Sequence, residues 1–193
     1  TIASCASRHN DESAMMAGID SGKFVSEVDG KPTALYLLKS SSGMEVAVTN
    51  YGGRIVALKV PGRDGVMRDV VLGSDSIQAY LPENNPTDFG AAIGRYANRI
   101  NHGRLPIDGD TIQLPVNNFG HTLHGGPKGW QYQVYDASQP DDSTLILSMD
   151  SPDGDNGFPG NVKATVTYKA LPDNKLDIAY SATTDSPTVI NLT

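Results

Sequence analysis

The sequence has little of three things: cysteine, clustered positive charge and long apolar runs. Its single cysteine among 193 residues, Cys5, excludes an internal disulfide. The 15 Lys and Arg residues are scattered and outnumbered by 22 Asp and Glu residues, which gives a net charge of −7. This pattern argues against nucleic acid as a partner, because phosphate binding needs clustered cations. No stretch approaches the ~20 apolar residues of a membrane helix.

The composition allows one well-buried core. With 38% hydrophobic residues, the length predicts one domain, or at most two. The first 22 residues differ from the rest. Ile2-Ala3-Ser4-Cys5 has the form of a bacterial lipobox, which is typical of a lipoprotein signal peptide. Residues 6–18 are small and polar without periodicity, as in a flexible tether.

Residues 1–22 are therefore predicted to be a signal remnant and a tether. The membrane would be contacted only through a lipid anchor at Cys5, and the protein would reside in the bacterial cell envelope, in the periplasm or lipid-anchored. The alternative is an unmodified cysteine in a disordered leader.

Residues 23–193 carry the pattern of strands. Short runs of Val, Ile, Leu and Tyr are separated by Gly, Asp, Asn and Pro. Residues 33–40 and 44–52 flank Ser41-Ser42-Gly43 and predict a hairpin. Period-two alternation over 163–168 and 175–182 predicts one core-facing set: Ala164, Val166, Tyr168, Leu176, Ile178 and Tyr180. Together these patterns predict an all-β protein, an antiparallel β-sandwich or open barrel.

Few residues show the sequence pattern of a helix. Residues 74–81 predict one or two turns, with Ser74 or Asp75 as the cap and Pro82 as the stop. Residues 153–160 begin like a calcium loop, but Gly157 stands where an oxygen ligand belongs. A tight turn is predicted there instead.

Two glycine-rich segments, 89–105 and 121–130, gather polar residues in sequence without a regular period. A buried arginine is expensive unless it is hydrogen-bonded. We therefore expect one of Arg95 and Arg99 to tie loops together and at least one to face a cleft. His121 and His124 have no third ligand nearby in the sequence, so no metal site is predicted. These observations alone leave open whether His124 has a structural or a functional role.

These segments carry a resemblance. Residues 89–126 read FGAAIGRYANRINHGRLPIDGDTIQLPVNNFGHTLHGG. This stretch resembles the signature region of the aldose 1-epimerases (galactose mutarotases), whose pattern is G-R-x-A-N-R-I, then G-x-F-x-x-D-G, an L-P-x-N segment and L-H-G-G. The runs NYGGRIVALKVPGRDG, VVLGSDSIQAYL and DGDNGFPGNVKATVTY resemble their counterparts in the same order. The resemblance covers nearly all of residues 24–193 and implies a galactose mutarotase-like supersandwich.

The resemblance implies roles for three residues. Asn98 and Arg99 would bind sugar hydroxyls, and His124 would lie beside the ring oxygen and the C1 hydroxyl as a catalytic and substrate-binding residue. Arg95 would belong to loop structure, and Leu105 stands on a core position where the family prefers Phe. The glycines around His124 are expected to let the backbone approach the sugar closely.

The implied function is interconversion of the α and β anomers of hexoses such as glucose and galactose, by acid–base opening and closure of the ring. The substrate would be a monosaccharide, with no cofactor and no metal. In the family, N-L-T is followed by N-H-x-Y-F-N-L, whose histidine is the general acid, and later by a sugar-binding aspartate and a glutamate base. The chain stops at Thr193. The sandwich is therefore expected to be incomplete at the C-terminus, and this chain alone is expected to be inactive.

Two other functions stay open. A non-catalytic carbohydrate-binding β-sandwich usually displays a row of exposed aromatic residues, but this chain has 7% aromatic residues and one tryptophan. A sugar-phosphate epimerase would need additional cations around the site, and the sequence shows no such cluster. The preferred sugar and the oligomeric state are not predicted.

Overall fold

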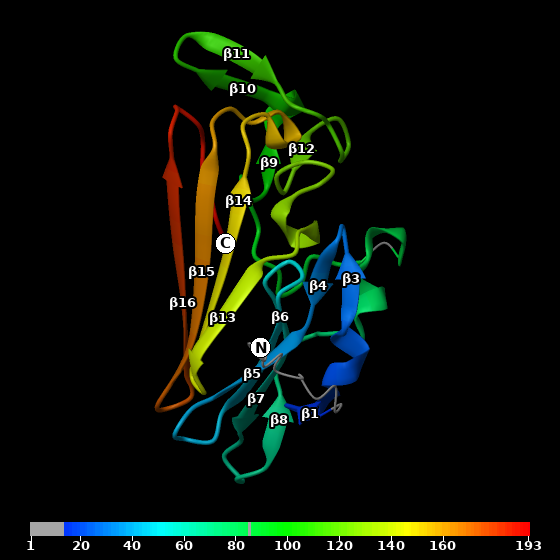
Figure 1. Ribbon diagram of the computed structural model, residues 1–193, viewed down its shortest axis with the longest axis vertical. Coiled ribbons are helices and arrows are strands. Elements are labelled where there is room, and N and C mark those ends of the chain that lie inside the picture. Colours follow the sequence, from blue (N-terminus) through cyan, green and yellow to red (C-terminus); the bar gives the residue numbers. More distant parts are fainter. Residues whose placement is uncertain (1–13, 85) are drawn as a thin grey trace, which may run out of the picture.

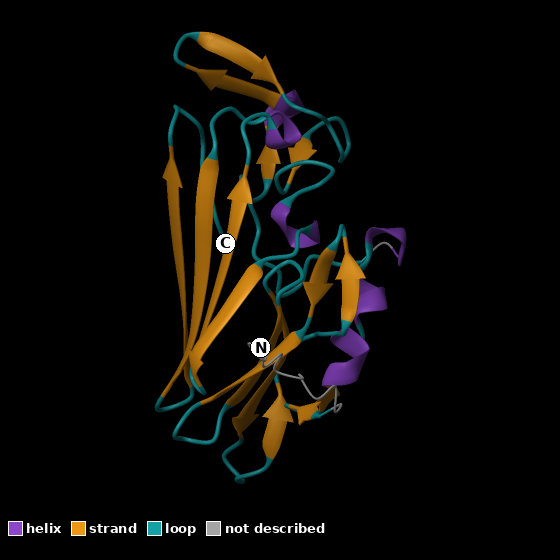
Figure 2. Ribbon diagram, in the orientation of Figure 1, coloured by secondary structure: helices purple, strands orange, loops and turns teal. Residues whose placement is uncertain are grey.

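The computed structural model describes residues 14–84 and 86–193. It is an all-β molecule built mainly from two four-stranded antiparallel sheets (Figures 1 and 2). The first sheet has the order β5 (Leu35–Lys39), β6 (Glu45–Thr49), β7 (Arg54–Pro61) and β8 (Met67–Asp69). The second has the order β13 (Asp136–Asp141), β14 (Thr144–Ser151), β15 (Val162–Leu171) and β16 (Lys175–Thr184).

Smaller elements decorate the sheets. Four two-stranded ribbons are β1 (Met15–Met16) with β2 (Ile19–Asp20), β3 (Ser26–Val28) with β4 (Lys31–Thr33), β9 (Arg99–Ile100) with β12 (Thr122–Leu123), and β10 (Arg104–Ile107) with β11 (Asp110–Gln113). The described helical segments are short 3-10 turns: η1 (Ser21–Phe24), η2 (Ile77–Tyr80), η3 (Pro82–Asn84), η4 (Asn101–Gly103), η5 (Trp130–Tyr132) and η6 (Asp155–Gly157). Within the described ranges, no helix has the length and apolar character that a membrane crossing requires.

The main core lies between the two sheets, as the alternation predicted. Ala164, Val166 and Tyr168 of β15 are buried, whereas the intervening Thr165 and Thr167 are only half-buried and the flanking Lys163 and Lys169 are exposed. The core also contains Leu38, Met44, Val46, Val48, Leu145, Leu147, Met149 and Val162. Burial of each Val, Leu or Met side chain contributes about 1.5–3 kcal/mol, so this layer is what holds the two sheets together.

A second cluster covers the other face of the first sheet. Phe24, Ile77 and Tyr80 of the 3-10 turns pack with Val56 and Ala57 of β7. The first sheet is thus buried on both faces, which explains why β6 is an almost continuous run of buried residues rather than an alternating one. The predicted hairpin of residues 33–52 is confirmed as β5 and β6, in antiparallel register.

The folded part begins before Lys23, within the segment that the sequence assigned to the tether. Residues 15–20 form the β1–β2 ribbon, and Ala17 is buried in the second cluster. Cys5 and the lipobox lie outside the described residues.

The last strand differs from expectation in its burial. Ile178 and Tyr180 of β16 pair with the buried Tyr168 and Val166, so they lie on the predicted face of the sheet. They are nevertheless 36% and 37% exposed. β15 is the only strand paired with β16 among the described residues, so β16 forms an edge of the described sheet.

Two local predictions have different outcomes. The turn at residues 153–160 is confirmed: η6 lies there, and Asp153 Oδ1 accepts a hydrogen bond from the Gly160 N–H at 2.6 Å. The capping of residues 74–81 was wrong. The 3-10 turn η2 begins after Ser76, whose side chain makes no cap, while Asp75 pairs with Lys23 at 3.1 Å.

Candidate functional site

The β9–β12 ribbon brings the three predicted site residues together. Arg99 lies on β9 and pairs in register with Leu123 of β12 (Figure 1). Asn98 immediately precedes β9, and His124 immediately follows β12. Residues 25 positions apart in the sequence therefore become neighbours because two very short strands pair antiparallel.

His124 is held on both sides by Asn98. The His124 N–H donates to the Asn98 carbonyl at 3.0 Å, and the Asn98 N–H donates to His124 Nδ1 at 2.9 Å. Because Nδ1 accepts a hydrogen bond, the proton of the neutral ring lies on Nε2. The side chain is 27% exposed, so the site presents an oriented N–H donor at the surface.

Arg99 is exposed and oriented by two asparagines. Its Nε and Nη2 donate to Asn118 Oδ1 at 3.2 and 2.9 Å, and its Nη1 donates to Asn98 Oδ1 at 3.3 Å. An arginine has five N–H donors. The N–H donors of Arg99 that are not used in these contacts make no hydrogen bond within the described part of the chain. They are therefore available to a ligand.

Asn118 is a site residue that the sequence reasoning missed. It begins a tight turn in which the Asn118 N–H donates to the His121 carbonyl at 3.1 Å and the His121 N–H donates to the Asn118 carbonyl at 2.9 Å. Phe119 and Gly120 in the turn have positive φ angles of 46° and 79°. The N-N-F-G sequence is a turn signal, but only the structure shows that this turn aims Asn118 at Arg99.

The glycines around His124 allow close contacts within the protein. Gly125 has a φ of +80°, and a Cβ there would lie 2.0 Å from the carbonyl oxygen of Gly94. A Cβ on Gly94 would in turn lie 2.1 Å from the Trp130 ring. These close approaches are between segments of the protein itself, and the approach of this backbone to a sugar stays a prediction.

Arg95 has the loop-tying role that was expected of it. It is 1% exposed. Its Nη2 donates to the carbonyls of Ser151 and Pro152, and its Nη1 to that of Pro159, each at 2.8 Å. Nε donates to Ser151 Oγ at 2.9 Å. Burial lowers the pKa of this guanidinium, an effect opposed by nearby aspartates. Arg95 therefore joins the segment before β9 to the β14–β15 connection beneath the site.

Asp88 is a second residue that the sequence did not indicate. Its Oδ2 lies 4.0 Å from His124 Nε2, and the two side chains are 28% and 27% exposed. The loop that carries it is held by Arg54, which is buried and donates from Nη1 to the carbonyls of Thr87 and Phe89 at 2.8 and 3.2 Å. No motif links Asp88 to His124, so only the folded chain reveals this pair.

His121 and Leu105 have structural surroundings. His121 Nδ1 accepts the N–H of His102 at 3.1 Å, and the two rings stack with centroids 4.9 Å apart. Leu105 is buried beside Ile100 and Phe158, as predicted for a core position. No cluster of three or more His, Cys, Asp or Glu side chains suited to a metal ion occurs in residues 14–84 and 86–193.

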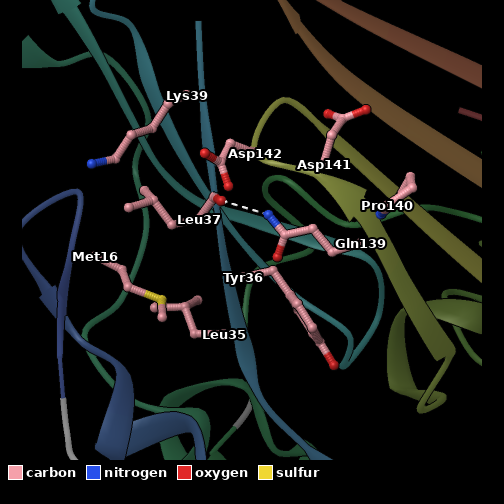
Figure 3. Close-up of a pocket in the computed structure, with 9 residues that line it drawn as sticks. All are labelled: Met16, Leu35, Tyr36, Leu37, Lys39, Gln139, Pro140, Asp141 and Asp142. Carbon is pink, nitrogen blue, oxygen red and sulfur yellow. Dashed lines mark hydrogen bonds between the residues drawn. The ribbon is translucent and has the colours of Figure 1, made fainter.

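A cavity of about 670 Å³ lies away from this site, at the end of the molecule where β5 and β13 meet (Figures 1 and 3). Two of its polar side chains, Gln139 and Asp141, have structural partners. Gln139 Nε2 donates to the Leu37 carbonyl at 2.8 Å, and Asp141 accepts bonds from the N–H and Oγ of Ser143, each at 2.8 Å. These bonds lower the pKa of Asp141. The cavity thus lies between the ends of strands, and the described residues that line it form no arrangement of catalytic side chains.

Comparison with known proteins gives one consistent result. A model of the family described as aldose 1-epimerase matches residues 34–193. The chain is 38% identical over 165 residues to the aldose 1-epimerase of Escherichia coli K12, covering 86% of this chain and 47% of that protein. It is 39% identical over 153 residues to the galactose mutarotase of Rattus norvegicus, covering 79% and 44%. The chain thus spans about half the length of the curated relatives it matches.

Solved structures agree. An aldose epimerase homologue from C. elegans superposes with a TM-score of 0.77 at 31% identity, covering 83% of this chain and 49% of that one. The galactose 1-epimerase of Lactobacillus acidophilus gives a TM-score of 0.75 at 29% identity, covering 86% and 49%. The antiparallel sandwich is therefore of the galactose mutarotase type, as the resemblance implied. The match over residues 34–193, the shared fold and the similarity to these relatives establish that the chain belongs to the aldose 1-epimerase family.

Proposed function

We propose that the complete protein interconverts the α and β anomers of aldohexoses such as glucose and galactose. The observation that carries this proposal is the oriented His124: the Asn98 N–H occupies Nδ1 and leaves the Nε2–H of this partly exposed side chain free to donate to a ligand. In this proposal His124 donates to the sugar near the ring oxygen and C1. The remaining donors of Arg99 and the Asn98 side-chain amide bind neighbouring hydroxyls.

The reaction needs an acid and a base and no redox partner. A base removes the proton of the C1 hydroxyl, the bond from C1 to the ring oxygen breaks, and the ring oxygen gains a proton. The resulting aldehyde rotates about the C1–C2 bond and closes on its other face, with each proton transfer reversed. The resemblance implies an acid directly after the N-L-T motif and a base much later in the sequence, which supports proposing the full reaction for the complete protein.

Polarimetry tests the proposal. The complete protein is expected to accelerate the change in optical rotation of freshly dissolved α-glucose or α-galactose in proportion to its concentration. The 193-residue chain alone is expected to add nothing to the spontaneous rate. A complete protein that leaves the rotation unchanged on both sugars would refute the activity, and an active 193-residue chain would refute the placement of the acid and base.

A non-catalytic carbohydrate-binding sandwich is the second candidate. Phe119 favours it, because this ring is 92% exposed beside the Asn118–Arg99 contact and an exposed aromatic face can stack on a sugar. Titration of the complete protein with sugar separates the two functions. Saturable binding with no effect on the rate of mutarotation would support the binding module over the enzyme.

We also propose that Cys5 is a lipid attachment site and that the protein resides in the bacterial cell envelope. The lipobox-like Ile2-Ala3-Ser4-Cys5 supports this. In a bacterial host, the full-length precursor is expected to incorporate radiolabelled palmitate and to partition into the detergent phase. Cys5→Ala should abolish both, with Cys5→Ser as a matched control that is also expected to stay unlabelled. Undiminished labelling of Cys5→Ala would rule out this anchor.

A further inference from the structure

The side chain of Asp88 lies in an energetically unfavourable environment. One carboxylate oxygen, Oδ1, is buried and has no hydrogen-bond partner among the described residues. The other, Oδ2, faces His124 Nε2 at 4.0 Å. Burying a polar atom without a partner is unfavourable, and such atoms in folded proteins call for an explanation.

The backbone around Asp88 is firmly held. Arg54 Nη1 binds the carbonyls on both sides of it, those of Thr87 and Phe89. The Asp88 carbonyl accepts the Ala91 N–H at 3.2 Å, and the Gly90 carbonyl accepts the Ile55 N–H at 2.9 Å. Burial lowers the pKa of Arg54, while Tyr80 and Asp88 oppose that effect. The short loop, held by Arg54 on both sides of Asp88, therefore fixes where its carboxylate lies.

The 4.0 Å separation between His124 Nε2 and Asp88 Oδ2 is too long for a direct hydrogen bond, but it suits one shared oxygen. An oxygen at about 2.8 Å from both atoms would make an angle of about 90° between them. Nε2 carries the proton and Oδ2 carries negative charge, so the shared atom must accept from one and donate to the other. Among sugar oxygens, a hydroxyl does both, whereas a ring oxygen can only accept.

We propose that Asp88 is a specificity-determining residue that accepts a hydrogen bond from one sugar hydroxyl, the same hydroxyl that accepts the Nε2–H of His124. The inference rests on the proposed function, because it takes a sugar as the ligand of this site. A site built to bind a hydroxyl rejects the analogue that lacks it, since its buried polar groups are then left without partners. Asp88 thus selects sugars that carry a hydroxyl at one ring position.

The test is a cycle between an Asp88 substitution and monodeoxy sugars. Dissociation constants of the complete protein are measured by calorimetric titration with glucose and its 1-, 2-, 3-, 4- and 6-deoxy analogues. Binding is measured instead of turnover because the 1-deoxy sugar cannot mutarotate. Asp88→Ala is expected to weaken glucose binding by about 10- to 100-fold. One deoxy sugar should bind the unsubstituted protein more weakly than glucose does, by a similar factor. Asp88→Ala should not weaken the binding of that sugar any further.

Glu83→Ala is the matched control, because Glu83 is an exposed carboxylate in the nearby η3, and it should leave every dissociation constant unchanged. Asp88→Leu keeps the branched shape of the side chain without an acceptor, serves if Asp88→Ala fails to fold, and should give the same single exception. An equal loss with all six sugars would overturn the proposal, because Asp88 would then act only through the structure of the site. Failure of the parent protein to bind any of the six would overturn it as well. Sugar binding with the single exception but no change in mutarotation rate would refute the proposed activity and leave the role of Asp88 standing.

Discussion

Replacement of His124 by alanine in the complete protein is expected to lower kcat by about a hundred- to a thousand-fold, a loss of ~3–4 kcal/mol of transition-state stabilisation. KM is expected to rise far less, because the contact of the Nε2–H with the sugar near C1 strengthens as charge develops on the reacting oxygens during ring opening. Arg99→Ala is expected to change the rate in the same direction. Polarimetry on α-glucose and α-galactose over a range of concentrations gives both constants.

Two variants make this result specific to the Nε2–H. His124→Asn places an oxygen acceptor near the position of Nδ1, so the bond from the Asn98 N–H is kept while the donor at Nε2 is lost. It should therefore be as inactive as His124→Ala but better folded. His121→Ala removes a histidine three positions away whose Nδ1 binds the His102 N–H, and it should keep most of the activity. Equal activities of His121→Ala and His124→Ala would show that the site has been assigned to the wrong histidine.

Arg95→Leu is expected to lower the free energy of unfolding by about 3–5 kcal/mol, as is typical when one partner of a buried charge network is removed. The substitution leaves the carbonyls of Ser151, Pro152 and Pro159 without their donor. It also leaves nearby aspartates without the cation that faces them. Urea denaturation of the complete protein, followed by fluorescence, measures the change.

Arg68→Leu is the control for this measurement. Arg68 is an exposed arginine that pairs with Asp64 at 2.7 Å on the surface, where an ion pair contributes little. Its loss should leave the unfolding midpoint nearly unchanged. A midpoint for Arg95→Leu that matches the one for Arg68→Leu would show that the hydrogen bonds of Arg95 do not stabilise the fold.

The class of fold and most of the candidate site could be predicted from the amino-acid sequence. Alternation of apolar residues along 163–168 identified the buried face of β15, because successive side chains of a strand point to opposite faces. The cost of burying a guanidinium anticipated that Arg95 or Arg99 would tie loops together. The G-R-x-A-N-R and L-H-G-G motifs indicated Asn98, Arg99 and His124, and the β9–β12 ribbon places all three side by side.

Which other groups face these three residues follows from long-range packing and could not be predicted from the sequence. Asp88 lies 36 positions before His124 in the sequence, and their 4.0 Å separation follows from how buried Arg54 holds one loop and how Gly125 packs against Gly94. Such distances depend on packing between segments that no local periodicity or turn propensity relates. The same holds for Ile178 and Tyr180: alternation sets the face of β16 on which they lie, but their burial depends on what else covers that face. Local sequence determines the direction of a side chain along its own strand or turn, whereas its neighbours in space are set by long-range packing of the whole chain.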